Sequence, residues 1–239
     1  DVYKRQVYNI ASGTSSNLVP TTVEDVNFSV PPVFDGRNIW YADKYQSANI
    51  YRYSIQTNSW NVFNYTTLLS IPQENIGACG YDGTSVYFFT DQTLTASLTL
   101  STLTSAISTY WIAYNTVTTS WSSFDWTSIG TGFSEPQIKQ ATFDGRYMTL
   151  ISYTHPFIIQ YDTTKSFSDS ASYTYVNYAT DPTIAVPNVP KTLGSTIYDG
   201  RFYTFFPYGS QAEIVLRYDT APAVDPTLLQ ASLIVKYDK

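Results

Sequence analysis

Charged residues, histidine and cysteine are all scarce in this 239-residue chain. Lys, Arg, Asp and Glu make up 13% of the residues, about half the share of an average domain. The single cysteine, Cys79, cannot form an internal disulfide, and its flanks "NIGACGYDG" indicate a small buried side chain rather than a reactive thiol. The single histidine, His155, excludes a histidine-rich metal site. The sequence therefore predicts neither a metal site nor a cofactor.

Long apolar runs and an excess of basic residues are also missing. No stretch approaches the roughly 18 to 20 apolar residues that a membrane-spanning helix needs, so no membrane span is expected. Nineteen acidic residues oppose thirteen basic ones, which gives a net charge of −6. Because phosphate backbones repel such a chain, nucleic acid is not an expected partner.

Aromatic residues are abundant, at 17% of the chain with 22 tyrosines, and the hydrophobic content of 43% is enough to fill a core. A surface rich in Ser, Thr and Tyr but poor in charge is commoner on extracellular and virion proteins than on cytosolic enzymes. We therefore favour an extracellular or virion-associated location. The first six residues, "DVYKRQ", resemble a translated sequencing-adapter end on a metagenomic fragment and are left out of the fold prediction.

The chain repeats one phrase four times, as "VFDGRNIWY", "GYDGTSVYFF", "TFDGRYMTLI" and "IYDGRFYTFF". The glycines of these Asp-Gly pairs are spaced by 47 (83 − 36), 62 (145 − 83) and 55 (200 − 145) residues. A second phrase follows each first one, for example "YRYSIQTNSW" and "VLRYDT". Four copies of each of these two phrases indicate a repeat protein.

Each copy has the local pattern of an antiparallel sheet. Asp-Gly between two β-branched and aromatic runs predicts a hairpin with a type I′ turn, in which both central residues take a positive φ. The second phrase supplies a third strand and a turn into a fourth. Four-stranded units at this period predict an all-β fold, a β-propeller of four-stranded antiparallel blades.

The signature "YSIQTNSW" and "YNTVTTSW" resembles the kelch class of propeller repeats, although the Gly-Gly pair of that class is replaced in this chain by "YADK", "FFTD", "ISYT" and "FFPY". The chain is more similar to uncharacterised bacterial and viral proteins with "YDGRxVYFVPY" followed by "VLRYDT", which matches residues 198–220. These resemblances imply a fold rather than an activity.

The repeat also predicts the limits of the blades. Residues 7–21 match the second half of a truncated blade, and four full blades follow over about 22–66, 67–127, 128–180 and 181–239. The half-blade either packs on as a partial fifth blade or belongs to a larger propeller of which this chain is an arc. The oligomeric state stays open at this point.

Residues at repeated positions are predicted to be structural, because the turn or the packing between blades requires them in every copy. They are Asp35, Gly36, Asp82, Gly83, Asp144, Gly145, Asp199, Gly200, Trp60 and Trp121. Arg37, Arg146 and Arg201 follow three of the turns and are expected to pair with carboxylates such as Asp162 or to cap backbone carbonyls.

Unrepeated residues fall in the connections at the opposite end of the sheets, and connections on a rigid scaffold are where binding residues usually lie. The predicted ligand-binding residues are Asp43, Lys44, Tyr45, Tyr153, His155, Tyr208 and Glu213. Aromatic rings beside hydrogen-bonding groups suit a glycan or protein ligand, so we expect a non-catalytic binding or structural propeller with no catalytic residues. The alternative is a propeller glycosidase or lyase that uses Glu74, Glu135 and Glu213, although the sialidase-type box SxDxGxxW is absent.

Overall fold

The computed structural model describes residues 6–9, 14–17, 30–43, 48–91, 109–129, 137–152, 156–178, 193–207, 214–219 and 235–236. Within these ranges nearly all regular structure is β-strand, arranged in four sheets of four antiparallel strands. Each sheet uses four strands in chain order, joined by hairpin-type connections. The predicted all-β class and the four-stranded antiparallel units are confirmed.

Each sheet begins with its innermost strand and ends with its outermost one. Sheet 1 contains β3 (Val33–Phe34), β4 (Asn38–Ala42), β5 (Asn49–Ser54) and β6 (Ser59–Asn64). Sheet 2 contains β7 (Ile76–Tyr81), β8 (Ser85–Thr90), β9 (Tyr110–Asn115) and β10 (Ser120–Asp125). Sheet 3 contains β11 (Ile138–Phe143), β12 (Tyr147–Ser152), β13 (Phe157–Asp162) and β14 (Tyr173–Asn177). Sheet 4 contains β15 (Leu193–Tyr198), β16 (Phe202–Pro207), β17 (Ile214–Asp219) and β18 (Val235–Lys236).

The remaining elements are short. A separate hairpin pairs β1 (Gln6–Asn9) with β2 (Thr14–Asn17). The helix α1 (Tyr65–Leu69) follows sheet 1. The 3-10 turn η2 (Trp126–Ile129) follows sheet 2, and η3 (Ser170–Ser172) directly precedes β14. No helix in the described part of the chain is long and apolar enough to cross a membrane.

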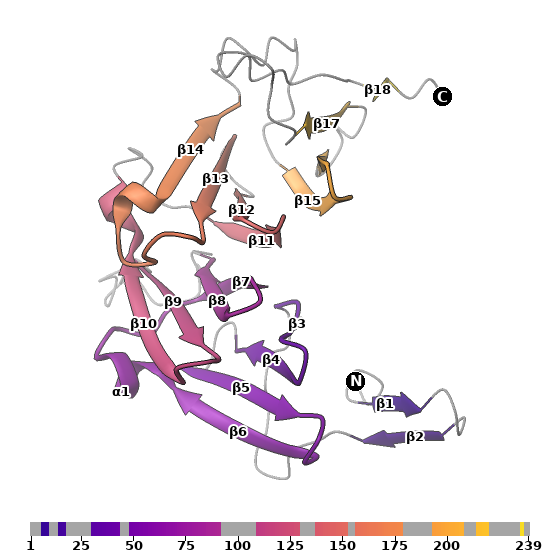
Figure 1. Cartoon of the computed structure of the whole chain (residues 1–239), viewed down its shortest axis with the longest axis vertical. Helices are drawn as coiled ribbons and strands as arrows, with labels where there is room; N and C mark the ends of the chain where they lie inside the picture. The colour runs from indigo at the N-terminus through magenta and orange to yellow at the C-terminus, as the bar shows by residue number, and fades with distance from the viewer. Residues whose placement is uncertain are drawn as a thin grey trace, which may run out of the picture.

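The four sheets follow one another along an arc (Figure 1). Strands β3, β7, β11 and β15 lie on its inner side, and β6, β10 and β14 lie on its outer side. Each inner strand contacts the inner strand of the next sheet. Each sheet therefore has one face toward the preceding sheet and one toward the following sheet, because side chains alternate along a strand.

Apolar side chains fill the three junctions between neighbouring sheets. The first junction buries Trp40 and Ile50 of sheet 1 against Phe88 and Tyr114 of sheet 2. The second buries Tyr87, Phe89 and Trp111 against sheet 3, and the third buries Ile151 against sheet 4. The core is thus divided into layers between sheets, which explains why most strands bury side chains on both faces.

Both tryptophans that were predicted to be structural lie in aromatic groups. The ring of Trp121 is 4.8 Å from that of Tyr114 within sheet 2, and it is 5.3 Å from that of Phe63 across the first junction. The ring of Trp60 is 5.1 Å from that of Tyr53 on the other face of sheet 1.

The Asp-Gly turns keep the predicted hairpins but not the predicted turn type. The glycines have positive φ, between 91° and 104°, yet the aspartates are not among the described non-glycine residues with positive φ. Instead, one oxygen of each aspartate accepts the backbone N–H groups two and three residues later, at 2.6 to 3.0 Å. This Asx-type geometry satisfies the turn with the aspartate's own side chain, so the type I′ prediction is wrong and Asp is required for a different reason.

Candidate functional site

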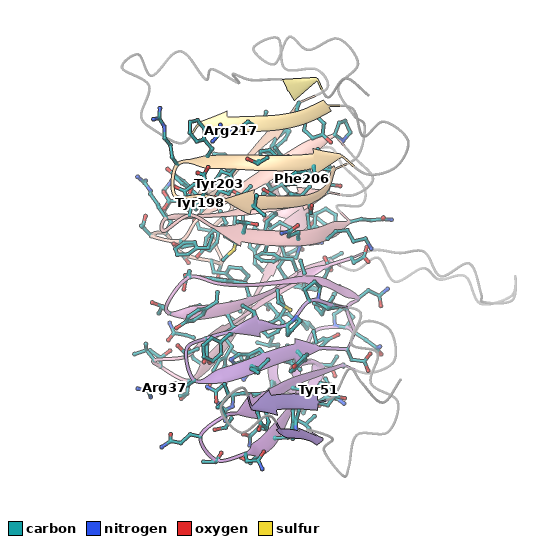
Figure 2. All side chains as sticks on the ribbon, turned by 90° about the vertical axis from the view of Figure 1, so that its right-hand side faces the viewer. Arg37, Tyr51, Tyr198, Tyr203, Phe206 and Arg217 are labelled. Atoms are coloured by element: carbon teal, nitrogen blue, oxygen red, sulfur yellow. The ribbon has the colours of Figure 1, made fainter. Side chains whose placement is uncertain are left out.

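The two ends of the sheets differ in how regular their connections are. At one end, called the turn end, the first and second strands of every sheet are joined by three-residue turns, at 35–37, 82–84, 144–146 and 199–201. At the other, called the loop end, the second and third strands are joined by 43–48, 91–109, 153–156 and 208–213. The connections between successive sheets, 65–75, 126–137 and 178–192, also lie at the loop end. In Figure 2, Arg37 marks the turn end of sheet 1.

Of the predicted ligand-binding residues, the structure describes Asp43. Its side chain is buried directly after β4, and its backbone N–H donates to the carbonyl of Asn49 at 3.3 Å. Six further predicted residues lie outside the described residues: Lys44, Tyr45, Tyr153, His155, Tyr208 and Glu213. Whether the seven come together stays a prediction.

Glu74, a candidate acid of the glycosidase alternative, is buried between sheets 1 and 2. The hydroxyl of Tyr65 donates to the carbonyl of Glu74 at 2.8 Å and accepts the N–H of Glu74 at 2.8 Å. Burial raises the pKa of Tyr65, and the nearby Glu74 and Asp43 carboxylates raise it further, so this hydroxyl stays protonated. These hydrogen bonds form a buried polar link within the connection between sheets 1 and 2. The other two candidate acids, Glu135 and Glu213, lie outside the described residues.

Polar links cross the second and third junctions. Lys139 of β11 forms an ion pair with the buried carboxylate of Asp91, which follows β8. In the third junction, Gln140 donates to the carbonyl of Thr196 at 2.7 Å and accepts the N–H of Thr196 at 2.9 Å. These two polar links therefore connect neighbouring sheets.

Sequence patterns did not identify these links, because their members do not recur at equivalent positions. The one sequence signal for such a link is the scarcity of charged residues. Charge is rare in this chain, so Asp91 at the end of the apolar run "VYFFTD" could have been expected to need a partner.

A crevice of about 690 Å³ opens between sheets 3 and 4 toward the turn end. Arg146, Asp162, Lys165 and Tyr198 contribute to its lining. The guanidinium of Arg146 donates to both oxygens of Asp162, at 2.8 and 3.4 Å, which is the pairing predicted for the arginine after the turn. Lys165 donates to the carbonyl of Ala171 at 3.4 Å. The charges of this crevice are thus engaged within the fold.

The Arg146–Asp162 pair predicts a pH-dependent contribution to stability. Arg146, and then Thr164, donate hydrogen bonds that hold the pKa of Asp162 well below its ordinary value. Because the folded-state pKa is the lower one, the stabilisation is complete above the unfolded carboxyl pKa of about 4 and is lost as the pH falls through the folded pKa. We expect Asp162→Asn to lower the free energy of unfolding at pH 7. The difference in free energy of unfolding between the variant and the unmodified chain should shrink as the pH falls below 4.

Urea unfolding of both chains at several pH values measures this difference. Arg146→Gln is the matched variant, because it removes the other partner and should flatten the same part of the pH profile. A difference between Asp162→Asn and the unmodified chain that stays constant from pH 7 to pH 3 would contradict the assignment.

Within the described ranges, no group of three or more His, Cys, Asp and Glu side chains is placed to hold a metal ion.

Comparison with models of known protein families finds no match, and comparison with curated protein sequences finds none either. Solved structures do match, across nearly the whole chain. A chain of the Mitotic Checkpoint Complex superposes with a TM-score of 0.54 at 10% identity, over 90% of this chain and 57% of that one. Hsv2 of Kluyveromyces lactis superposes with a TM-score of 0.51 at 9% identity, over 90% and 64%. A candidate 6-phosphogluconolactonase from Bacteroides fragilis superposes with a TM-score of 0.56 at 12% identity, over 98% of this chain and 63% of that one.

The chain has the β-propeller fold. Its four sheets are four propeller blades, as the repeat predicted, and the matched structures are propellers too. The chain spans about three-fifths of the length of each of these structures. At identities this low the likeness concerns the fold, which hosts many functions.

Proposed function

We propose that this chain is a non-catalytic binding β-propeller that recognises a glycan or protein through its loop end. The main support for the proposal is that the connections are uniform at one end of the blades and variable at the other. Turns at one end are uniform, and their aspartates satisfy the turn backbone, whereas connections at the other end differ from blade to blade. A scaffold that repeats its structure at one end and varies it at the other presents its specificity at the variable end.

The described charges support binding rather than catalysis. Glu74 is buried in the connection between blades 1 and 2, and Asp91 is buried in an ion pair with Lys139 of blade 3. A substrate cannot reach either carboxylate in this fold. A hydrolase with paired acids needs two carboxylates facing a common substrate, which would leave Glu135 and Glu213 to supply them. No observation on the described residues favours that alternative.

The proposed ligand contacts are the unrepeated residues of the loop end, Lys44, Tyr45, Tyr153, His155, Tyr208 and Glu213. Asp43 is buried and is therefore not proposed as a direct contact. Tyrosine rings supply apolar area for the face of a sugar ring or for a peptide, and the neighbouring polar groups orient it. We also propose that the chain is kelch-like and acts outside cells or on virions. Its low charge and its abundant Tyr, Ser and Thr support this location.

Binding to a glycan array tests the proposal. We expect Tyr153→Ala and Tyr208→Ala each to weaken binding of an array hit about tenfold, since loss of a stacked ring removes roughly 1 to 2 kcal/mol. The matched control is Val117→Ala at the turn end, where the side chain is 76% exposed, and it should bind unchanged.

Two results would count against the proposal, and a third would narrow it. Weakening by Val117→Ala alone would place the ligand at the turn end. Shortening of the bound glycan, seen by mass spectrometry after incubation, would favour the enzyme alternative. An array without hits would remove the glycan version and leave a protein ligand.

A further inference from the structure

The junction between blades 3 and 4 departs from the first two junctions at one repeated position. Five residues after the aspartate of the Asp-Gly turn, blades 1 and 2 have the large aromatic residues Trp40 and Tyr87. The ring of Trp40 lies 4.9 Å from that of Tyr114 in blade 2, and the ring of Tyr87 lies 5.5 Å from that of Tyr161 in blade 3. In blade 3 this position holds Thr149, which has no ring to pack against blade 4. The crevice of about 690 Å³ opens in this third junction.

The same change alters the surroundings of Asp144, the turn aspartate that lines the crevice. In blades 1, 2 and 4 the second oxygen of the turn aspartate accepts a hydrogen bond from a side chain, at 2.6 to 3.2 Å. Thr149 does not take this role, because its hydroxyl accepts from Gln160 at 3.4 Å. Burial, and to a smaller extent the Asp144 carboxylate, raise the pKa of Tyr203 in blade 4, yet the Tyr203 hydroxyl donates to the carbonyl of Tyr147 at 3.4 Å. Asp144 can therefore accept a further donor from a ligand.

The other side of the crevice carries a cation whose charge is not neutralised within the described residues. Lys165, in the connection between β13 and β14, is exposed, and its ammonium donates to the carbonyl of Ala171 at 3.4 Å. The ion pairs of the described residues do not include Lys165. Arg146, which also lines the crevice, is neutralised by Asp162. The crevice thus offers one cation and, at Asp144, one anion to a ligand.

The two charges are separated by the width of the sheet between them. Asp144 lies at the turn between β11 and β12, and Lys165 lies in the connection between β13 and β14 at the same end of the sheet. Neighbouring strands are about 4.8 Å apart, so two strand spacings place the two backbone sites roughly 10 Å apart. A ligand that meets both residues therefore needs a positive and a negative group at its two ends.

The lining between the two charges suits a peptide. Gln160 of β13 and Thr174 of β14 both line the crevice, and an amide and a hydroxyl each donate and accept hydrogen bonds. They match the alternating N–H and C=O groups of an extended backbone. Tyr147 and Tyr198 also line the crevice, and their rings supply apolar area for peptide side chains.

We propose that this crevice binds a short peptide with free ends, its terminal ammonium at Asp144 and its terminal carboxylate at Lys165. An extended chain advances about 3.3 to 3.6 Å per residue, so about three residues span the roughly 10 Å between the two sites. The crevice volume of about 690 Å³ lies within the range of small-ligand sites. This site lies at the turn end, so the inference goes beyond the proposed loop-end binding and does not depend on it.

Isothermal titration calorimetry of the purified 239-residue chain with the tripeptide alanyl-phenylalanyl-alanine tests the proposal. We expect binding in the millimolar range or tighter. The N-acetylated tripeptide and the C-amidated tripeptide should each bind about tenfold more weakly, because each loses one charge-assisted hydrogen bond. No binding of the free tripeptide at millimolar concentration overturns the proposal, and so does equal binding of the free and the two blocked forms.

A variant of Lys165 tests which residue meets the carboxylate. Lys165→Met should weaken the free tripeptide about tenfold and should not weaken the C-amidated form further, since that form has no carboxylate to lose. Arg37→Met is the matched control, because it removes an exposed cation from the turn end of blade 1, away from Tyr198 of the crevice (Figure 2). It should bind both forms as the unmodified chain does. Unchanged binding in Lys165→Met, or equal weakening in the two variants, overturns the assignment of the carboxylate to Lys165.

Discussion

Replacing Trp40 by alanine is expected to lower the free energy of unfolding by about 3 to 5 kcal/mol, the range for truncating a fully buried large aromatic side chain. Trp40 is fully buried in the first junction. Its ring lies 4.9 Å from that of Tyr114 and 6.4 Å from that of Trp121, both in blade 2. The loss therefore falls on the contact between two blades as well as on blade 1.

Trp40 also supports the turn of its own blade. Its indole N–H donates to the second oxygen of Asp35 at 2.7 Å, while the first oxygen holds the turn backbone. Tyr87 does the same for Asp82 through its hydroxyl, at 2.6 Å. Truncation of Trp40 thus opens a cavity and removes one partner of a hydrogen bond, and both effects act in the same direction.

Chemical denaturation monitored by far-ultraviolet circular dichroism measures this loss. Trp60→Ala is the matched control, because the same side chain is removed from the same blade but from a half-buried site on the outermost strand. We expect Trp60→Ala to lower the free energy of unfolding by less than half as much as Trp40→Ala. Equal losses in the two variants would contradict the assignment of the core to the junctions.

Gly77→Ala is expected to have the second largest effect, a loss of about 3 kcal/mol, at the upper end of what overpacking usually costs. A Cβ atom at Gly77 would lie 2.2 Å from the carbonyl oxygen of Ile138 and 2.3 Å from the Cβ of Asp91. Neither neighbour can rotate away, because one is backbone of blade 3 and the other is the first side-chain atom of a buried residue. Relief of the clash with Ile138 requires that blades 2 and 3 move apart, and relief of the clash with Asp91 requires a shift within blade 2. Both movements also strain the Asp91–Lys139 ion pair.

Gly80→Ala serves as the control for this variant. Its added methyl group would first meet the sulfur of Met148 at 2.7 Å, at the flexible end of a side chain that can move aside. We expect a loss of at most about 1 kcal/mol, given that adaptability. Thermal and urea unfolding of the two variants side by side would rank them, and a larger loss for Gly80→Ala would contradict the close approach at Gly77.

The repeated phrases predicted the architecture well because each one encodes a local hairpin. Alternating aromatic and β-branched residues on both sides of Asp-Gly specify two strands and their connection without any distant contact. The turn type was wrong for a related reason. The Asp-Gly pair favours positive φ at both central residues, whereas the Asp35 carboxylate accepts hydrogen bonds from the turn backbone and leaves the positive φ to Gly36.

The loop end was harder to predict because its interactions are not local. Asp91 and Lys139 are 48 residues apart and belong to different blades, so no repeat or spacing connects them. Glu74 stands in an irregular segment, where a charged residue is normally solvated, yet the fold buries it beside Tyr65. A sequence pattern shows which residues share a strand face but not which side chains meet across two blades.

Hydrogen exchange of the chain with and without a glycan that it binds on the array tests the central claim most directly. The account predicts that added protection appears in the loop-end peptides that contain residues 43–48, 153–156 and 208–213. It predicts unchanged exchange in the turn-end peptides around 35–37, 116–119 and 144–146. Protection confined to the turn-end peptides would contradict a binding propeller whose specificity lies in its variable connections.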